Sequence, residues 1–110
     1  MEITGQTKIV GVIGWPLTYT LSPTMHNAAI QKAGLDYVYL AFPIPPDRLE
    51  QAVRGLQACG VRGLNVTIPH KERVIALMDE LSVEAQAIGA VNTISMDGEK
   101  MRGANTDVYG

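Results

Sequence analysis

The sequence is poor in the residues that build disulfide bonds and zinc sites. Its 110 residues include one cysteine, Cys59, and two histidines, His26 and His70. A lone cysteine excludes an intramolecular disulfide and fits a reducing compartment, so we expect a cytoplasmic protein. Because these three side chains lie far apart in the sequence, no metal site is expected.

Strong net charge and long apolar runs are missing as well. The formal net charge is −2, which gives no electrostatic reason to bind nucleic acid or an anionic membrane. The longest nearly apolar run, Ile9 to Leu17, contains glycine and proline and is shorter than the roughly 18 apolar residues of a transmembrane helix. Met1 to Thr4 has no basic residue, so no secretory signal is visible. Neither nucleic acid nor a membrane is therefore expected as a partner.

The apolar residues that are present, 46% of the chain, are enough for the core of one domain. Their pattern predicts strands at residues 9–14, 37–42, 61–68, 90–96 and 99–102. It predicts helices at residues 22–33, 45–59, 69–78 and 82–88. The alternation favours an α/β fold, a three-layer α-β-α sandwich with a mostly parallel sheet. The Asp97-Gly98 turn adds one antiparallel strand from a C-terminal hairpin.

Apolar spacing also predicts which side of each long helix faces the core. In the helix at 45–59, four apolar residues recur at i, i+3, i+4 and i+7: Leu49, Ala52, Val53 and Leu56. In the helix at 22–33, the inner side is expected to carry Met25, Ala28, Ala29 and Ala33. Three tyrosines, Tyr19, Tyr37 and Tyr39, are each expected in the core or in a pocket wall.

Ligands of open parallel sheets bind at the carboxyl ends of the strands, here the loops at 15–22, 65–71 and 92–93. The first strand carries Gly11-x-x-Gly14, and neither G-x-G-x-x-G nor a P-loop occurs in the sequence. The fingerprint of a dinucleotide-binding domain is therefore absent from this chain.

The hydroxyls of Thr20 and Ser22 lie two positions apart, just before the first predicted helix. Alternate side chains of an extended segment point the same way, and a helix N-terminus adds unpaired N–H groups and a positive dipole end. Together these groups could hold a small carboxylate. In the alternative interpretation, Ser22 is an ordinary N-cap and Thr20 is a loop residue.

Polar residues also mark the end of the third predicted strand. Asn65 and Thr67 share one face of that strand, opposite Val66 and Ile68, and burying them is costly unless they meet a ligand or a partner. Lys71 falls in the first turn of the next predicted helix, where the helix dipole disfavours a cation. That placement indicates a functional role, and the alternative is a solvated surface lysine.

Two further polar segments follow. Asn92 lies at the start of the fourth predicted strand, and Asn105 and Asp107 follow the hairpin. In the simplest interpretation, Asn105 or Asp107 caps a helix that begins near Val108.

Four motifs combine these residues in a specific order. They are Gly14-Trp15-Pro16 with Thr20-Leu21-Ser22-Pro23-Thr24-Met25-His26-Asn27, then Asn65-Val66-Thr67-Ile68-Pro69-His70-Lys71, then Gly89-Ala90-Val91-Asn92-Thr93, and finally Gly103-Ala104-Asn105-Thr106-Asp107. The combination strongly resembles the shikimate dehydrogenase family over nearly the whole chain, from about Ile9 to Gly110.

The resemblance implies that residues 1–110 form the N-terminal substrate-binding domain of an NADP-dependent oxidoreductase, whose NADP-binding Rossmann domain is absent from this chain. The family reversibly reduces 3-dehydroshikimate to shikimate with NADPH in aromatic amino-acid biosynthesis. NADP would be bound mainly by the absent domain, so we expect no tightly bound cofactor and no activity from the chain alone. The implied partner is the small-molecule substrate, and a homodimer is left open.

The resemblance also implies roles for individual residues. Thr20 and Ser22 match the hydroxyl pair that receives the substrate carboxylate. The residues that match contacts to the ring hydroxyls are Thr67, Asn92 and Asp107. Lys71 and Asp107 match the catalytic pair, with Lys71 also touching the substrate, and Asn65 matches a residue that supports the pocket.

One position departs from the family pattern. The family usually has Ser where this chain has Thr20, and the added methyl group stiffens the side chain. The choice between shikimate and quinate therefore stays open. Two alternatives also remain: a free-standing shikimate- or quinate-binding module without catalysis, and a fragment of a quinate/shikimate dehydrogenase.

Overall fold

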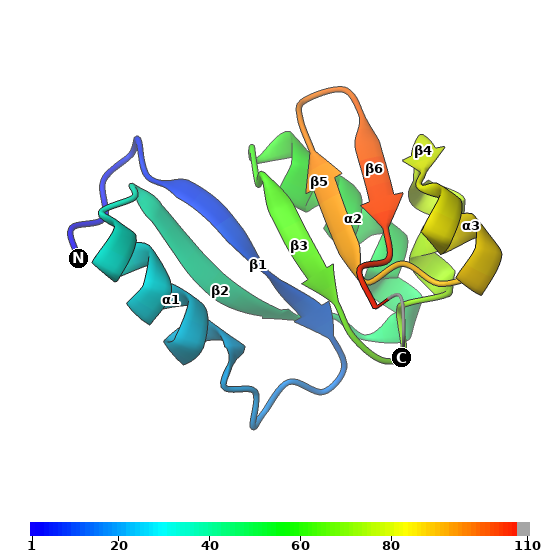
Figure 1. Ribbon diagram of the computed structural model, residues 1–110, viewed down its shortest axis with the longest axis horizontal. Coiled ribbons are helices and arrows are strands. Elements are labelled where there is room, and N and C mark those ends of the chain that lie inside the picture. The colour runs from blue at the N-terminus through cyan, green and yellow to red at the C-terminus, as the bar shows by residue number, and fades with distance from the viewer. Residues whose placement is uncertain (108–110) are drawn as a thin grey trace.

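A computed structural model describes residues 1–107, and the helix expected near Val108 lies outside the described residues. Six strands form one sheet in the order β2-β1-β3-β5-β6-β4 (Figure 1). The strands are β1 (Lys8–Gly14), β2 (Tyr37–Pro43), β3 (Gly63–Val66), β4 (Glu80–Leu81), β5 (Thr93–Met96) and β6 (Met101–Ala104). The helices are α1 (Ser22–Ala33), α2 (Leu49–Ala58) and α3 (Val83–Ile88), with two short 3₁₀ helices, η1 (Pro46–Arg48) and η2 (Arg73–Leu77).

The strand directions confirm a mostly parallel sheet. β1 runs parallel to β2 and β3, and β6 runs parallel to β4, whereas β5 is antiparallel to both of its neighbours. The antiparallel strand is thus the first arm of the hairpin and not the second arm, where the sequence predicts it. The reason is that Val66 N donates to Asn92 O at 2.8 Å, so β5 starts beside the end of β3 and must run back. A β5 parallel to β3 would have to begin at the other end of the sheet. The short connection between α3 and β5 does not reach that far, because a parallel crossover needs a longer segment.

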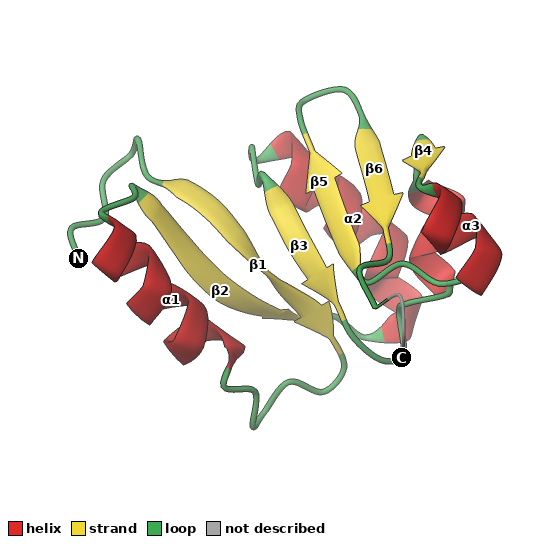
Figure 2. Ribbon diagram, viewed as in Figure 1, coloured by secondary structure: helices red, strands yellow, loops and turns green. Residues whose placement is uncertain are grey.

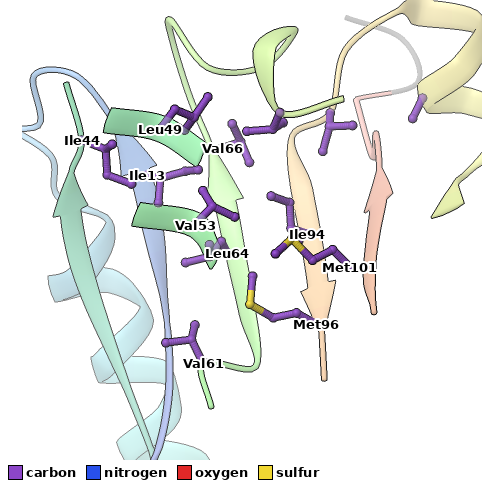
Figure 3. Packing of buried hydrophobic residues seen from close by; sticks show 13 residues of the cluster. Ile13, Ile44, Leu49, Val53, Val61, Leu64, Val66, Ile94, Met96 and Met101 are labelled. Atoms are coloured by element: carbon purple, nitrogen blue, oxygen red, sulfur yellow. The ribbon is translucent and has the colours of Figure 1, made fainter. Parts of the chain in front are cut away.

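One face of the sheet is closed by α2, which lies behind the middle of the sheet (Figure 2). The predicted inner side of α2 is confirmed, because Leu49 and Val53 are buried and Ala52 and Leu56 pack against the same cluster. Sheet residues including Ile13, Leu64, Val66, Ile94 and Met101 form the other half of this core (Figure 3). Each such side chain contributes about 1.5–3 kcal/mol when it leaves water, so this layer carries most of the apolar stabilisation.

The helix α1 packs against β2 and β1 on the opposite face, which completes the three layers. Its predicted inner side is wrong: no residue of α1 is buried, and Met25 is 68% exposed. The helix instead contacts the sheet through His26, whose ring stacks on Tyr39 with 4.1 Å between centroids. Asn27 adds two hydrogen bonds of 2.8 Å to the main chain of Tyr39. These bonds satisfy backbone groups that an edge strand leaves without a partner, so α1 is attached by polar contacts rather than by an apolar stripe.

The segment after β3 also differs from its prediction. A turn and the short η2 replace the helix expected at 69–78. His70 is fully buried there, and its Nε2 lies 2.8 Å from the carbonyl oxygen of Ile44, which ties the segment to the chain after β2. Because β3 ends at Val66, the alternation of faces ends with it, and Ile68 is 72% exposed instead of sharing the buried side of Val66.

Candidate ligand-binding site

The motif segments meet at one edge of the sheet, where β1, β3 and β6 end and β5 begins (Figure 1). Trp15 N donates to Ile68 O at 3.1 Å, which joins the loop after β1 to the loop after β3. Val66 N donates to Asn92 O at 2.8 Å, and Asn92 N donates to Ala104 O at 3.0 Å. Polar residues from distant parts of the sequence are therefore gathered at the edge where open α/β sheets bind ligands.

The first pair of hydroxyls lies at the start of α1. The Thr20 hydroxyl accepts a 3.3 Å hydrogen bond from Ser22 N, so both residues belong to one tight turn. The helix begins at Ser22, with Leu21 in the N-cap position and no side chain capping the first turn. The interpretation of Ser22 as an ordinary N-cap is therefore wrong.

The second pair of polar side chains comes from the end of β3. Asn65 points to the α1 side of the sheet, opposite the buried Leu64 and Val66. The Tyr39 hydroxyl donates to Asn65 Oδ1 at 2.7 Å. Burial raises the pKa of Tyr39, and a hydrogen bond with the Ser22 side chain opposes that rise in part. The hydrogen bond between Tyr39 and Asn65 thus joins β2 to β3, and Ser22 at the start of α1 is near enough to the phenol to affect its pKa.

Thr67 lies over the end of β1, where the chain has Gly14. A side chain at Gly14 would collide with the methyl group of Thr67, and its Cβ would also come within 2.9 Å of Leu17 Cδ2. The glycine therefore lets the loop after β3 approach β1 closely. A surface hollow of about 330 Å³ results. It is lined by Pro16, Leu17, Thr18, Tyr19, Thr20, Thr67 and Ile68. Thr20 and Thr67, two of the predicted substrate-binding residues, share this hollow.

Asn92 connects the start of β5 to the segment after β6. Its Oδ1 accepts hydrogen bonds from Thr106 N at 3.1 Å and from Thr93 Oγ1 at 2.9 Å. Its Nδ2 donates to Thr106 Oγ1 at 3.2 Å. The amide therefore holds the segment 105–107 in place, and it keeps one Nδ2 hydrogen for a further acceptor.

Both residues of the predicted catalytic pair have main-chain contacts next to this connection. Lys71 is half-buried and its carbonyl oxygen accepts from Val91 N at 2.8 Å, next to Asn92. Asp107 is exposed, and its N–H donates to Asn105 Oδ1 at 2.9 Å. The ion pairs formed among residues 1–107 join Glu50 to Arg54 and Arg102 to Glu80 and Asp97. Lys71 and Asp107 are thus not paired within 4.0 Å in this structure.

Sequence reasoning missed the part played by two residues. Tyr39 is 3% exposed and also reaches the site, so it is core and pocket wall at once. Asn105 is 8% exposed, and its Nδ2 donates to Ala90 O at 3.1 Å while its Oδ1 fixes the turn at Asp107. It therefore supports that turn from below. Nothing in the strand pattern distinguished Tyr39 from Tyr37. The only sequence signal for Asn105 was its place in the fourth motif.

Two features are absent from the part of the chain that the structure describes. There, no group of three or more His, Cys, Asp or Glu side chains is arranged to hold a metal ion. Within residues 1–107, no helix has both the length and the apolar character needed to cross a membrane.

The fold and the site together define an α/β ligand-binding domain, with hydroxyl, amide, ammonium and carboxylate groups presented at one sheet edge. The family described as "Shikimate dehydrogenase substrate binding domain" matches residues 12–94. The chain belongs to this family.

Individual relatives agree with the family match. The chain is 57% identical to "Shikimate dehydrogenase (NADP(+))" of Nostoc sp. over 98% of its own length and 37% of that protein. A solved shikimate dehydrogenase in complex with NADP+ matches it with a TM-score of 0.92 and 47% identity, over 96% of this chain and 37% of the other. The shikimate 5-dehydrogenase of Listeria monocytogenes, solved with shikimate and NAD, gives a TM-score of 0.92 and 45% identity over 97% and 37% of the two chains. The chain therefore spans little more than a third of the length of these relatives.

A dinucleotide does not fit the described residues. β1 leads into Trp15 and Pro16, and seven residues separate it from α1. A dinucleotide-binding domain would have a glycine-rich turn that opens directly into a helix N-terminus.

Proposed function

We propose that this domain binds shikimate and 3-dehydroshikimate, and that the whole protein interconverts them with NADP as the redox partner. The observation that carries the proposal is the gathering of Thr20, Ser22, Asn65 and Thr67 at one sheet edge, in a chain of this family. The relative from Listeria monocytogenes, which was solved with shikimate, supports the choice of ligand.

The carboxylate of the ligand is assigned to Thr20 and Ser22 at the start of α1. No acidic residue lies in the first turn of this helix, and no side chain caps it. Two hydroxyl donors, the first N–H groups and the positive end of the helix dipole therefore favour an anion without any formal cation. Thr67, Asn92 and Asp107 are assigned to the ring hydroxyls, and Asn65 supports the pocket.

Lys71 and Asp107 are assigned to the chemical step. When a ketone is reduced, negative charge grows on its oxygen, and a positioned ammonium group stabilises that charge and supplies a proton. Lys71 is half-buried at the edge of the site and is assigned this role. Asp107, on the turn held by Asn92 and Asn105, is assigned to hold and polarise the ammonium group. In the reverse direction, neutral Lys71 accepts the alcohol proton.

The remaining assignments concern the whole protein. NADP is assigned to a domain outside this chain, so the 110 residues alone should show no dehydrogenase turnover and hold no tight cofactor. The lone Cys59 favours a cytoplasmic location away from membranes. A homodimer is a separate prediction, which sedimentation equilibrium of the purified protein would test.

The test is an NMR titration of the 110-residue chain with shikimate, repeated with quinate. We expect chemical-shift changes at Thr20, Thr67 and Asn92, and none at Gly98 in the distant hairpin. The ligand with the larger and earlier changes is the preferred one. An absence of changes around the sheet edge with both ligands would refute the proposed ligand class.

A further inference from the structure

The Tyr39 side chain links two strands that are not neighbours in the sheet. Tyr39 is in register with Val10 of β1, while Asn65 of β3 is in register with Val12 of the same strand. The tyrosine therefore reaches across β1 to place its hydroxyl 2.7 Å from Asn65 Oδ1. This hydrogen bond connects the α1 edge of the sheet with the strand end that carries two predicted site residues.

The rest of Tyr39 is held by contacts that do not involve its hydroxyl. The His26 ring stacks on it at 4.1 Å with an interplanar angle of 6°. Asn27 binds its main-chain N–H and carbonyl, each at 2.8 Å. Because ring and backbone are fixed in this way, the hydroxyl has a defined position even before a ligand arrives.

We propose that Tyr39 is a positioning residue, whose hydroxyl sets the orientation of the Asn65 amide for the anionic, polyhydroxylated ligand. This inference rests on the proposed function. An asparagine whose side chain is free to rotate presents either its oxygen or its NH₂ group to a ligand, and the oxygen repels a carboxylate. The Tyr39 hydroxyl occupies Oδ1, so the Nδ2 hydrogens point away from Tyr39 as donors. Within residues 1–107, Nδ2 makes no hydrogen bond of its own.

The protonation of the Tyr39 phenol is consistent with its role as a hydrogen-bond donor to Asn65. Burial raises the pKa of Tyr39 above its ordinary value of 10.0, against a smaller opposing effect of Ser22. The phenol therefore carries a proton at neutral pH, and the 2.7 Å geometry directs that proton to Asn65 Oδ1. The side chain of Ser22, the first residue of α1, is the source of that smaller effect.

Tyr37 provides a matched control on the same strand and the same side of the sheet. Both tyrosines line the hollow between α1 and the sheet. The ring of Tyr37 lies 5.7 Å from the Lys8 ammonium, and its hydroxyl makes no hydrogen bond in the described part of the chain. Tyr37→Phe removes the same atom as Tyr39→Phe without touching Asn65.

The first experiment needs no ligand. The side-chain amide resonances of Asn65 are recorded by NMR for the 110-residue chain and for the two Tyr→Phe variants. We expect Tyr39→Phe to move these resonances while the main-chain amide spectrum stays folded, and Tyr37→Phe to leave them in place. If Tyr39→Phe leaves them unchanged, the positioning role is overturned, whether or not shikimate binds.

The second experiment is a double-mutant cycle read by titration with shikimate. Losing one hydrogen-bond partner should weaken binding by about 3- to 10-fold in Tyr39→Phe, with no such loss in Tyr37→Phe. In the Asn65→Ala background, Tyr39→Phe should have no further effect, because the amide it orients is gone. Additive losses, or equal losses in both Tyr→Phe variants, would overturn the proposal. If the unaltered chain fails to bind shikimate, the proposed function fails, and the ligand-free experiment still decides whether Tyr39 orients Asn65.

Discussion

The two faces of the sheet differ in what they bury. The face under α2 is packed with apolar side chains such as Ile13, Val53 and Ile94, each at most 1% exposed. The α1 face carries Asn65, Thr67 and Thr93 in half-buried positions, and its helix is attached through a ring stack and an asparagine. Stability is therefore assigned to the α2 face, and ligand chemistry to the polar side chains at the strand ends. Substitutions on the α2 face should change the free energy of unfolding, and substitutions at the ligand edge should change binding or turnover.

The largest effect is expected for Lys71→Ala in a protein that joins this chain to the proposed NADP-binding domain. Loss of a positioned proton donor should lower kcat roughly 10²- to 10⁴-fold, with little change in the KM for shikimate. Steady-state kinetics measure this, and Lys100→Ala in the exposed hairpin is the control. An unchanged kcat would remove Lys71 from the chemical step.

On the packed face, Ile94→Ala should cost about 2–5 kcal/mol of unfolding free energy, because it leaves a cavity in the core. Met25→Ala, on the exposed side of α1, should stay within about 0.5 kcal/mol of the parent chain. Urea denaturation followed by circular dichroism measures both. Similar losses of unfolding free energy in the two variants would show that both faces contribute equally to stability, which would contradict the assignment of stability to the α2 face.

A smaller effect is expected at Gly14, the last residue of β1, at the edge where the ligand is proposed to bind. Gly14→Ala forces a Cβ into the Thr67 side chain and should cost about 1–3 kcal/mol. It should also displace Thr67 and so weaken shikimate binding. Gly55→Ala in α2 is the control, since nothing lies within 4 Å of the added methyl group; it should stabilise the helix by about 0.5–1 kcal/mol. If Gly14→Ala behaves like Gly55→Ala, the close approach of Thr67 is not a constraint.

The smallest effect is expected at Asp97, in the hairpin away from the ligand edge. Main-chain N–H groups of Glu99 and Lys100, together with Arg102, lower the pKa of Asp97 below its ordinary 3.8. A carboxylate with a lowered folded-state pKa stabilises the fold above the unfolded-state value, and the contribution is lost as pH falls through the folded-state value. The Tm difference between the parent chain and Asp97→Asn should therefore be constant above about pH 5 and shrink below pH 4. A difference that stays constant down to pH 2 would contradict this linkage.

Local pattern was a reliable guide where packing follows helix periodicity. Leu49 and Val53 are buried as their spacing predicts, because α2 lies flat on the apolar face of the sheet. The same reasoning failed for α1, where Met25 is exposed and His26 and Asn27 make the contacts. A helix at a sheet edge can be held by a few specific polar contacts, and hydrophobic periodicity carries no information about them.

In the site, too, some features could be predicted from the sequence and others could not. The motifs around Thr20, Asn65 and Lys71 could be recognised from residue types and order. The Tyr39–Asn65 bond could not, because it joins residues 26 positions apart across an intervening strand. Nor could the turn that Asn105 fixes at Asp107 be distinguished from an ordinary helix cap.

By itself, the sequence determined the α/β class, the family and the chemical groups available for a ligand, because these follow from local periodicity and from motif order. Only the tertiary structure decided the direction of β5, the attachment of α1 and the hydrogen bond between Tyr39 and Asn65. Those features depend on contacts between segments that are distant along the chain. Such contacts form only when the sheet assembles, because a short stretch of sequence does not specify which distant segment will lie beside it.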